Sequence, residues 1–127
     1  MTPRVLVVED NPVNLELVTE LLEREGCRVL PAPSAEAAIR LAATERPDLV
    51  LMDLQLPGMT GYEATRRLKA APATAAIPVL ALTSYAMRGD DLKASEAGCD
   101  GYLTKPLDTN LFRKTVRRFL ARDTKGE

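Results

Sequence analysis

Short apolar runs alternate with longer helical patterns along this chain, and the alternation limits the folds open to it. The runs typical of strands are residues 4–8, 27–32, 49–52, 79–82 and 100–104. Strands that alternate with helices predict a parallel sheet covered by helices on both faces, with right-handed crossovers. We therefore expect an α/β fold with a doubly wound, five-stranded parallel sheet and five helices.

Capping residues mark the start of each expected helix. Each can accept hydrogen bonds from backbone N–H groups that the first helical turn leaves free; they are Asn11, Ser34, Thr60, Asp90 or Asp91, and Asp108. Gly26 and Gly98 end the first and fourth helices. The 127 residues suit one domain, residues 1–122, followed by a polar C-terminal tail at 123–127.

The net charge, the cysteine and histidine content and the lack of long apolar stretches limit the partners and sites that this chain can have. A net charge of -1 implies neither a strongly basic nor a strongly acidic partner. The basic segment near the C-terminus, within residues 113–122, suits a solvated helix face better than direct nucleic-acid binding. Cys27 and Cys99 are far apart and the chain has no His, so we expect free thiols rather than a thiolate metal site. A signal-peptide core and apolar stretches of membrane length are absent from the sequence, so we expect a cytoplasmic protein with no membrane contact.

Polar side chains stand at the ends of four expected strands: Glu9 and Asp10, Asp53, Thr83, and Lys105. Two strand orders are common in doubly wound sheets, and one of them, 2-1-3-4-5, brings the ends of strands one and three together. Carboxylates about 4 Å apart repel by ~4 kcal/mol at an intermediate dielectric, so such a cluster needs a cation. Mg²⁺ suits it, because this ion takes few carboxylates and often bridges to phosphate. With the ammonium of Lys105 and the hydroxyl of Thr83 nearby, this group of residues suits phosphoryl transfer to Asp53.

Each of these residues has a simpler interpretation when it is taken alone. Glu9 and Asp10 can be a charge pair at a helix N-terminus, Asp53 can be a turn residue, and Lys105 before Pro106 carries little information. A purely structural role is hard to reconcile with four strand ends that each carry a polar group of the required type.

The sequence resembles the receiver domain of bacterial two-component response regulators, in the CheY-like superfamily, over essentially its whole length. The matching stretches are VVEDN at 7–11, LMDLQLPGMTG at 51–61, LTS at 82–84 and GYLTKP at 101–106. Residues 9–11 and 86–90 are most similar to DivK-type single-domain regulators and the receivers of hybrid kinases. The resemblance implies a flavodoxin-like fold with strand order 2-1-3-4-5.

The resemblance also implies a phosphoacceptor and a metal site. Asp53 would accept a phosphoryl group from a phosphohistidine. Mg²⁺ or Mn²⁺ would be bound by Asp10 directly, by Glu9 through water, by Asp53 and by the backbone carbonyl of Gln55. Glu9 stands where the family more often has Asp, which leaves metal binding intact as an expectation.

The remaining motif residues have implied roles in binding the phosphoryl group and in switching. Lys105 would bind a phosphate oxygen, and the peptide bond between Lys105 and Pro106 would be cis. Thr83 would move to bond the phosphoryl group while Tyr102 turns inward. A two-position hydroxyl coupled to a two-position ring would form a bistable element. The output would appear at the face made by the fourth helix, fifth strand and fifth helix, with candidate contacts Lys93, Glu96, Tyr102, Lys114 and Arg117.

The first helix carries two apolar strips. At ~100° per residue one strip holds Leu15, Val18 and Leu22, and the other holds Val13, Leu17 and Leu21. One strip must face the sheet. By the family resemblance, the docking residues for a sensor histidine kinase or histidine phosphotransfer protein are Val13, Asn14, Leu17 and Leu21. The alternative is that all six apolar residues belong to the core, which is at least as good an interpretation for Leu21.

Three competing interpretations remain at this point. The chain can be a receiver excised from a longer protein. It can be an enzyme of the haloacid-dehalogenase type. Those enzymes require a second Asp two positions after the nucleophile, and this chain has Gln55 there. It can be a flavodoxin-like FMN carrier, although the segment after the first strand is not a Ser/Thr/Gly-rich phosphate loop. The signalling interpretation expects a downstream protein target and a monomer or weak dimer.

Overall fold

The computed structural model describes residues 2–83 and 90–125. Ser84 and residues 86–89, which contribute to the family resemblance, lie outside these ranges, as do the last two residues of the expected tail.

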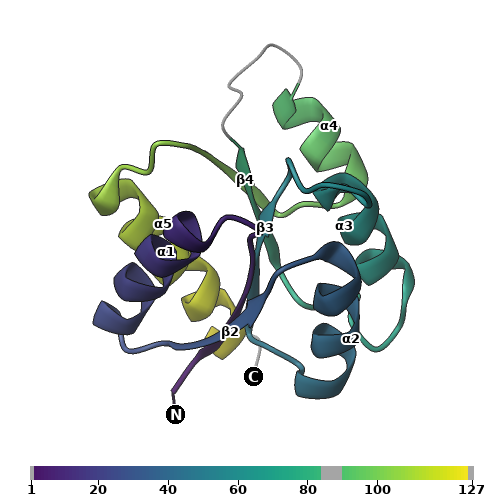
Figure 1. The fold of residues 1–127 in the computed structure, drawn as a ribbon. Helices are drawn as coiled ribbons and strands as arrows, with labels where there is room; N and C mark the ends of the chain where they lie inside the picture. Colours follow the sequence, from purple (N-terminus) through teal and green to yellow (C-terminus); the bar gives the residue numbers. More distant parts are fainter. Residues whose placement is uncertain (1, 84–89, 126–127) are drawn as a thin grey trace.

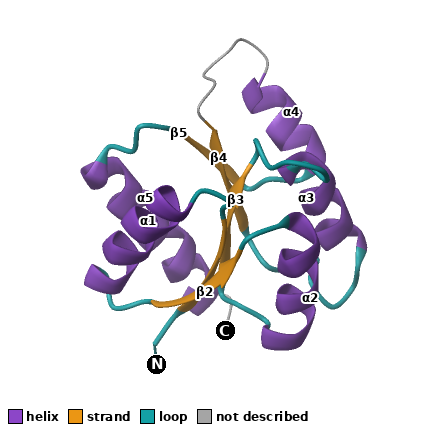
Figure 2. Cartoon of the chain, viewed as in Figure 1, coloured by secondary structure: helices purple, strands orange, loops and turns teal. Residues whose placement is uncertain are grey.

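A parallel five-stranded sheet forms the centre of the molecule, with strand order β2-β1-β3-β4-β5 (Figures 1 and 2). The strands are β1 (Arg4–Val8), β2 (Arg28–Ala32), β3 (Leu49–Asp53), β4 (Val79–Thr83) and β5 (Gly101–Thr104). The helices are α1 (Pro12–Arg24), α2 (Ala35–Glu45), α3 (Gly61–Ala70), α4 (Asp90–Ala97) and α5 (Thr109–Lys125). This order confirms the doubly wound, flavodoxin-like fold expected from the sequence.

The sheet is covered on both faces, as Figure 1 shows, with α1 and α5 on one side and α2, α3 and α4 on the other. Alternate strand residues supply the two cores, because successive side chains of a strand point to opposite faces. In β1, Val5 and Val7 pack with the α1 and α5 side, and Leu6 and Val8 pack with the other helices. All five residues of β3 and of β4 are buried, as expected for central parallel strands.

Capping side chains begin α1, α2, α3 and α5 at the expected positions. Asn11 Oδ1 accepts from the N–H groups of Val13 and Asn14, at 2.9 and 3.2 Å. The side chains of Ser34 and Thr60 likewise accept hydrogen bonds in the first turns of α2 and α3. Asp108 accepts from the N–H of Leu111 at 3.0 Å in the first turn of α5.

Several boundaries differ from the expected ones for local reasons. Strand β2 begins one residue late, because the N–H of Cys27 bonds back to Leu22 at the end of α1. Strands β3 and β4 each include one more residue, because Asp53 pairs with Leu82 and Thr83 pairs with Thr104. Helix α5 continues to Lys125 and so takes in most of the segment expected to be a tail, since the sequence offers no glycine to end it before residue 126. Among the described residues, no helix has the length and apolar character that a membrane span requires.

Candidate functional site

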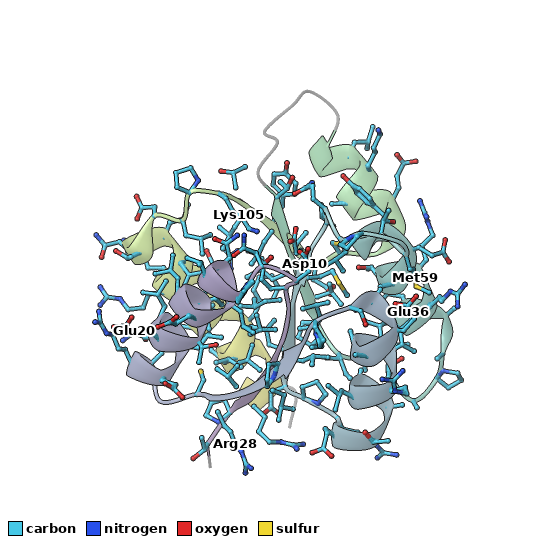
Figure 3. The ribbon with its side chains drawn as sticks, in the orientation of Figure 1. Asp10, Glu20, Arg28, Glu36, Met59 and Lys105 are labelled. Atoms are coloured by element: carbon cyan, nitrogen blue, oxygen red, sulfur yellow. The ribbon has the colours of Figure 1, made fainter. Side chains whose placement is uncertain are left out.

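The carboxyl ends of β1, β3, β4 and β5 meet at one edge of the sheet. Asp53 is the last residue of β3, Thr83 is the last residue of β4, and Glu9 and Asp10 follow β1 directly. Lys105 follows β5, and the peptide bond that joins it to Pro106 is cis. Figure 3 labels Asp10 and Lys105, which lie close to the ends of the central strands. The fold therefore gathers the candidate residues that the sequence places far apart.

Three carboxylates form a compact cluster at this edge. One oxygen from each of Glu9, Asp10 and Asp53 lies within 4.8 Å of the others. Glu9 and Asp53 are buried, each with 3% of its surface exposed, and Asp10 is exposed. Hard carboxylate oxygens on a partly open face match the preferences of Mg²⁺ and Mn²⁺. The donor set therefore fits the expected metal.

Lys105 supplies the positive charge that faces this cluster. Its Nζ lies 2.8 Å from Glu9 Oε1 and 3.6 Å from Asp53 Oδ2. The Lys105 side chain is 15% exposed, so the ion pair with Glu9 is largely shielded from water. The sequence predicted that Lys105 would stand opposite Asp53, but gave no indication that Glu9 is its nearer partner.

Burial raises the pKa of Glu9 above the ordinary glutamate value, because the charged form loses water. The hydrogen bond from Lys105 works in the opposite direction, and a contact with Asp53 and its negative charge raise the pKa further. The N–H of Asn11, which donates to Glu9 Oε2 at 3.2 Å, lowers it slightly. The net result is a carboxyl group that holds its proton more tightly than a free glutamate does.

The loop after β3 is held close to Asp53. The N–H of Gln55 donates to Asp53 Oδ1 at 2.9 Å, and the N–H of Leu54 donates to the carbonyl of Leu82 at 2.9 Å. Gly61 lies against this loop, since a Cβ atom there would overlap the Asp53 carbonyl oxygen and approach Leu54 Cα to 2.8 Å. The Gln55 side chain also reaches across to β4, where its Nε2 donates to Thr83 Oγ1 at 2.7 Å. Sequence reasoning assigned a role only to the Gln55 backbone carbonyl and missed this contact.

Helix α1 buries one of its two apolar strips and exposes most of the other. Val18 and Leu22 are buried and Leu15 packs beside them, so this strip faces the sheet. Val13 is 73% exposed and Leu17 is 48% exposed. The other two docking candidates are half-buried: Asn14, and Leu21, which packs against the core.

A groove of about 170 Å³ lies between the surface of α1 and the segment that contains Lys105. It is lined by Asn14, Leu17, Val18, Lys105, Pro106 and Leu107. The groove thus connects the surface of α1 with the residue that faces Asp53.

The five candidate residues of the expected output face are all at least partly exposed. Lys93, Glu96 and Lys114 are exposed, and Tyr102 is half-buried against the core on the α2, α3 and α4 side. Arg117 instead donates from Nε to Glu25 Oε1 at 2.6 Å, directly after α1. Its guanidinium therefore lies on the α1 side of α5, and we leave it out of this face.

Comparison with known proteins gives consistent matches over nearly the whole chain. A family model described as the response regulator receiver domain matches residues 5–117. The polar-differentiation response regulator DivK of Brucella ovis is 39% identical over 120 residues, which cover 94% of this chain and 98% of that protein.

Two solved structures show the same arrangement in three dimensions. One is the receiver domain of a sensor histidine kinase from Pseudomonas aeruginosa PAO1, described with a magnesium ion coordinated in the active site cleft. It has a TM-score of 0.88 and 35% identity, and the match covers 95% of this chain and 99% of that one. The other is a putative response regulator from Chloroflexus aurantiacus J-10-fl, with a TM-score of 0.91, 30% identity and the same two coverages.

Proposed function

The chain belongs to the response regulator receiver family of two-component signalling, and from that premise we propose that it accepts a phosphoryl group on Asp53. The observation that supports this residue most directly is its placement. Asp53 ends a central strand within the carboxylate cluster, and its Oδ2 lies 3.6 Å from the Lys105 ammonium. Family membership also removes the reasons for considering a dehalogenase-type enzyme or an FMN carrier.

The two carboxylate oxygens of Asp53, one of which would be the nucleophile, have different surroundings. Oδ1 accepts the N–H of Gln55, and Oδ2 faces Lys105. In the proposed transfer, a carboxylate oxygen of Asp53 forms a bond to phosphorus as the bond from phosphorus to the donor imidazole nitrogen breaks. Lys105 then binds a phosphoryl oxygen through its ammonium, and the Thr83 hydroxyl donates to another.

A divalent ion belongs to the proposal because the donor set fits it. Asp10, Asp53 and the backbone carbonyl of Gln55 would hold Mg²⁺ or Mn²⁺ directly, and Glu9 would hold it through water. The ion would supply positive charge beside the transferring phosphoryl group. We propose that the same residues also support slow self-catalysed dephosphorylation.

The partners follow from this chemistry. A phosphohistidine on a sensor kinase or a phosphotransfer protein would dock on Val13, Asn14, Leu17 and Leu21 of α1, beside the groove that leads to Lys105. The phosphorylated form would then act on a downstream protein through the face of α4, β5 and α5. We propose a monomer or weak dimer that works in the cytoplasm without binding nucleic acid directly.

Phosphorylation by a small donor tests the acceptor without needing a kinase. Protein incubated with acetyl phosphate and Mg²⁺ should gain the mass of one phosphoryl group, measured on the intact protein. Asp53→Asn should gain none, and excess chelator should prevent the gain in the wild type. Asp108→Asn is the matched control, because Asn also caps a helix and this residue lies outside the cluster. A phosphoryl group that persists in Asp53→Asn would refute the assignment.

A further inference from the structure

The side chain of Gln55 forms a hydrogen bond that the proposed chemistry does not use. Its Nε2 donates to Thr83 Oγ1 at 2.7 Å, which joins the loop after β3 to the end of β4. Thr83 is fully buried, and its backbone is fixed by pairing with Thr104 and by the N–H of Lys105, which donates to its carbonyl at 2.7 Å. With that backbone held in the sheet, the part of Thr83 that is left to move is its side chain.

The backbone at Gln55 and on either side of it is held in place. The N–H of the same residue donates to Asp53 Oδ1, so the amide that holds Thr83 is anchored to the proposed phosphoacceptor. Leu54 and Leu56, on either side of Gln55, are buried, which fixes the path of the loop. The Gln55 side chain therefore reaches Thr83 from a backbone segment that buried neighbours hold in place.

Rotation of Thr83 breaks this bond. Threonine changes χ1 between staggered positions, and such a step moves Oγ1 by roughly 2 Å. A hydrogen bond that starts at 2.7 Å does not survive a displacement of that size. A conformation with the hydroxyl turned to a phosphoryl group on Asp53 therefore loses the contact with Gln55.

We infer that Gln55 is a positioning residue that holds Thr83 in its unphosphorylated rotamer, and so sets how readily the switch turns. This inference rests on the proposed function, because it assumes that Thr83 moves to a phosphoryl group on Asp53. A net hydrogen bond made in only one of two conformations favours that conformation by roughly two- to tenfold. The half-buried Gln55 amide can turn to water when Thr83 leaves, so the loss stays within that range.

The phosphoryl group overcomes this restraint when it forms. Its oxygens are charged acceptors, and hydrogen bonds to charged acceptors are stronger than those between neutral groups. The Gln55 contact therefore suppresses the switched rotamer before phosphorylation without preventing it afterwards. Removal of the contact should raise the background of switched molecules.

The direct test compares wild type with Gln55→Leu, which removes the amide donor and keeps an uncharged side chain that branches at its end. Three-bond couplings at Thr83 report its χ1 populations by NMR, in unphosphorylated protein at saturating Mg²⁺. We expect the minor rotamer to gain two- to tenfold in Gln55→Leu, and likewise in Gln55→Asn, whose amide is one methylene too short. Unchanged Thr83 couplings in both variants would overturn the inference.

A double-mutant cycle separates an action through Thr83 from a general effect on the loop. Gln55→Leu should alter the rate of phosphoryl gain from acetyl phosphate two- to tenfold in the wild-type background. In the Thr83→Val background, which lacks the hydroxyl, the same substitution should have no further effect. An equal effect in both backgrounds would contradict a role through Thr83. The Thr83 couplings are measured before phosphorylation, so their outcome is independent of whether Asp53 is the acceptor, which the mass measurement decides.

Discussion

Lys105 forms an ion pair with Glu9 at 2.8 Å, although Glu9 also belongs to the proposed metal site. The Glu9 side chain is only 2% exposed in this pair, and the same ammonium lies 3.6 Å from Asp53. Without a metal, Lys105 is therefore the cation among the described residues that offsets the repulsion among the carboxylates. A bound divalent ion would take over part of that task and leave Lys105 available to a phosphoryl group.

Lys105→Met should destabilise the metal-free protein far more than the Mg²⁺-bound protein. Removal of one partner of a buried ion pair costs about 3–5 kcal/mol, and Mg²⁺ should restore much of it. Urea unfolding with chelator or with saturating Mg²⁺ measures the difference. Lys69→Met is the control, because Lys69 pairs with Asp100 at 2.9 Å away from the cluster and its loss should be insensitive to Mg²⁺. Equal Mg²⁺ sensitivity of the two variants would count against this role of Lys105.

The raised pKa of Glu9 predicts a pH dependence of stability in chelator. Because burial raises the pKa, the folded protein keeps the Glu9 proton to a higher pH than the unfolded chain does. Stability therefore falls as pH rises from the ordinary glutamate value to the raised one, since the folded state binds more protons there. The free energy of unfolding, measured by urea at a series of pH values, should fall in wild type relative to Glu9→Gln over this window. A difference between the two proteins that is constant with pH would exclude this account.

Gly61→Ala should damage both the fold and the metal site. A Cβ atom there would overlap the Asp53 carbonyl oxygen, which is backbone and cannot turn aside. We expect a loss of about 1–3 kcal/mol in the free energy of unfolding, together with weaker Mg²⁺ binding because the Asp53 loop shifts. In Gly101→Ala, the new atom would instead meet the side chains of Phe119 and Leu80, at 2.8 and 2.9 Å. This control should lose stability and keep its Mg²⁺ affinity, as measured by calorimetric titration.

Charge substitutions on α1 should separate docking from chemistry. Val13 is 73% exposed at the start of the strip beside the groove that reaches Lys105. Val13→Glu should slow transfer from a phosphorylated histidine phosphotransfer protein by roughly tenfold, the effect of about 1.4 kcal/mol lost at an interface. The rate with acetyl phosphate should be unaffected. Ala43→Glu, at an exposed site on α2 across the sheet, should change neither rate. Slowing of both reactions by Val13→Glu would refute the docking role.

The fold and the cluster were predictable because they depend on local signals. Apolar runs of strand length, capping residues and the polar residue at the end of each strand are all visible along the chain. A parallel sheet necessarily brings the ends of its strands to one edge. The proximity of Glu9, Asp10 and Asp53 then follows from the strand order 2-1-3-4-5, which the local signals left open and the family resemblance implied.

Side-chain partners across the sheet were not predictable in the same way. Lys105 and Glu9 are 96 positions apart, and several carboxylates lie within reach of the ammonium. The Gln55 bond to Thr83 depends on the path of a loop, and the pairing of Arg117 with Glu25 depends on how α5 rotates against α1. The ends of β3 and β4 also differ by one residue from those expected, because pairing with a neighbouring strand decides where a strand ends.

We expect the positions of the Thr83 and Tyr102 side chains to be coupled. These residues lie on neighbouring strands, with Thr83 opposite Thr104 and Tyr102 opposite Ala81, so a change at the end of β4 would act on β5 at close range. The Tyr102 ring is half-buried against the α2, α3 and α4 side, which leaves it room to become either more buried or more exposed.

Phosphorylation should bury the Tyr102 ring, because the turn of Thr83 toward Asp53 vacates space beside β5. The ring signals of Tyr102 in NMR spectra should shift on phosphorylation of the wild type, toward those of a ring in an apolar environment. Thr83→Ala should still gain the phosphoryl group by mass, since Asp53 and Lys105 are intact, but its Tyr102 signals should no longer respond. Tyr62 is the internal reference, because it is half-buried on α3 and its ring signals should stay fixed in both proteins. A half-buried aromatic residue on a strand can also be there for packing alone, and in that case the Tyr102 signals of phosphorylated wild type would match those before phosphorylation. That outcome would exclude the coupled switch for this protein even with Asp53 established as the acceptor.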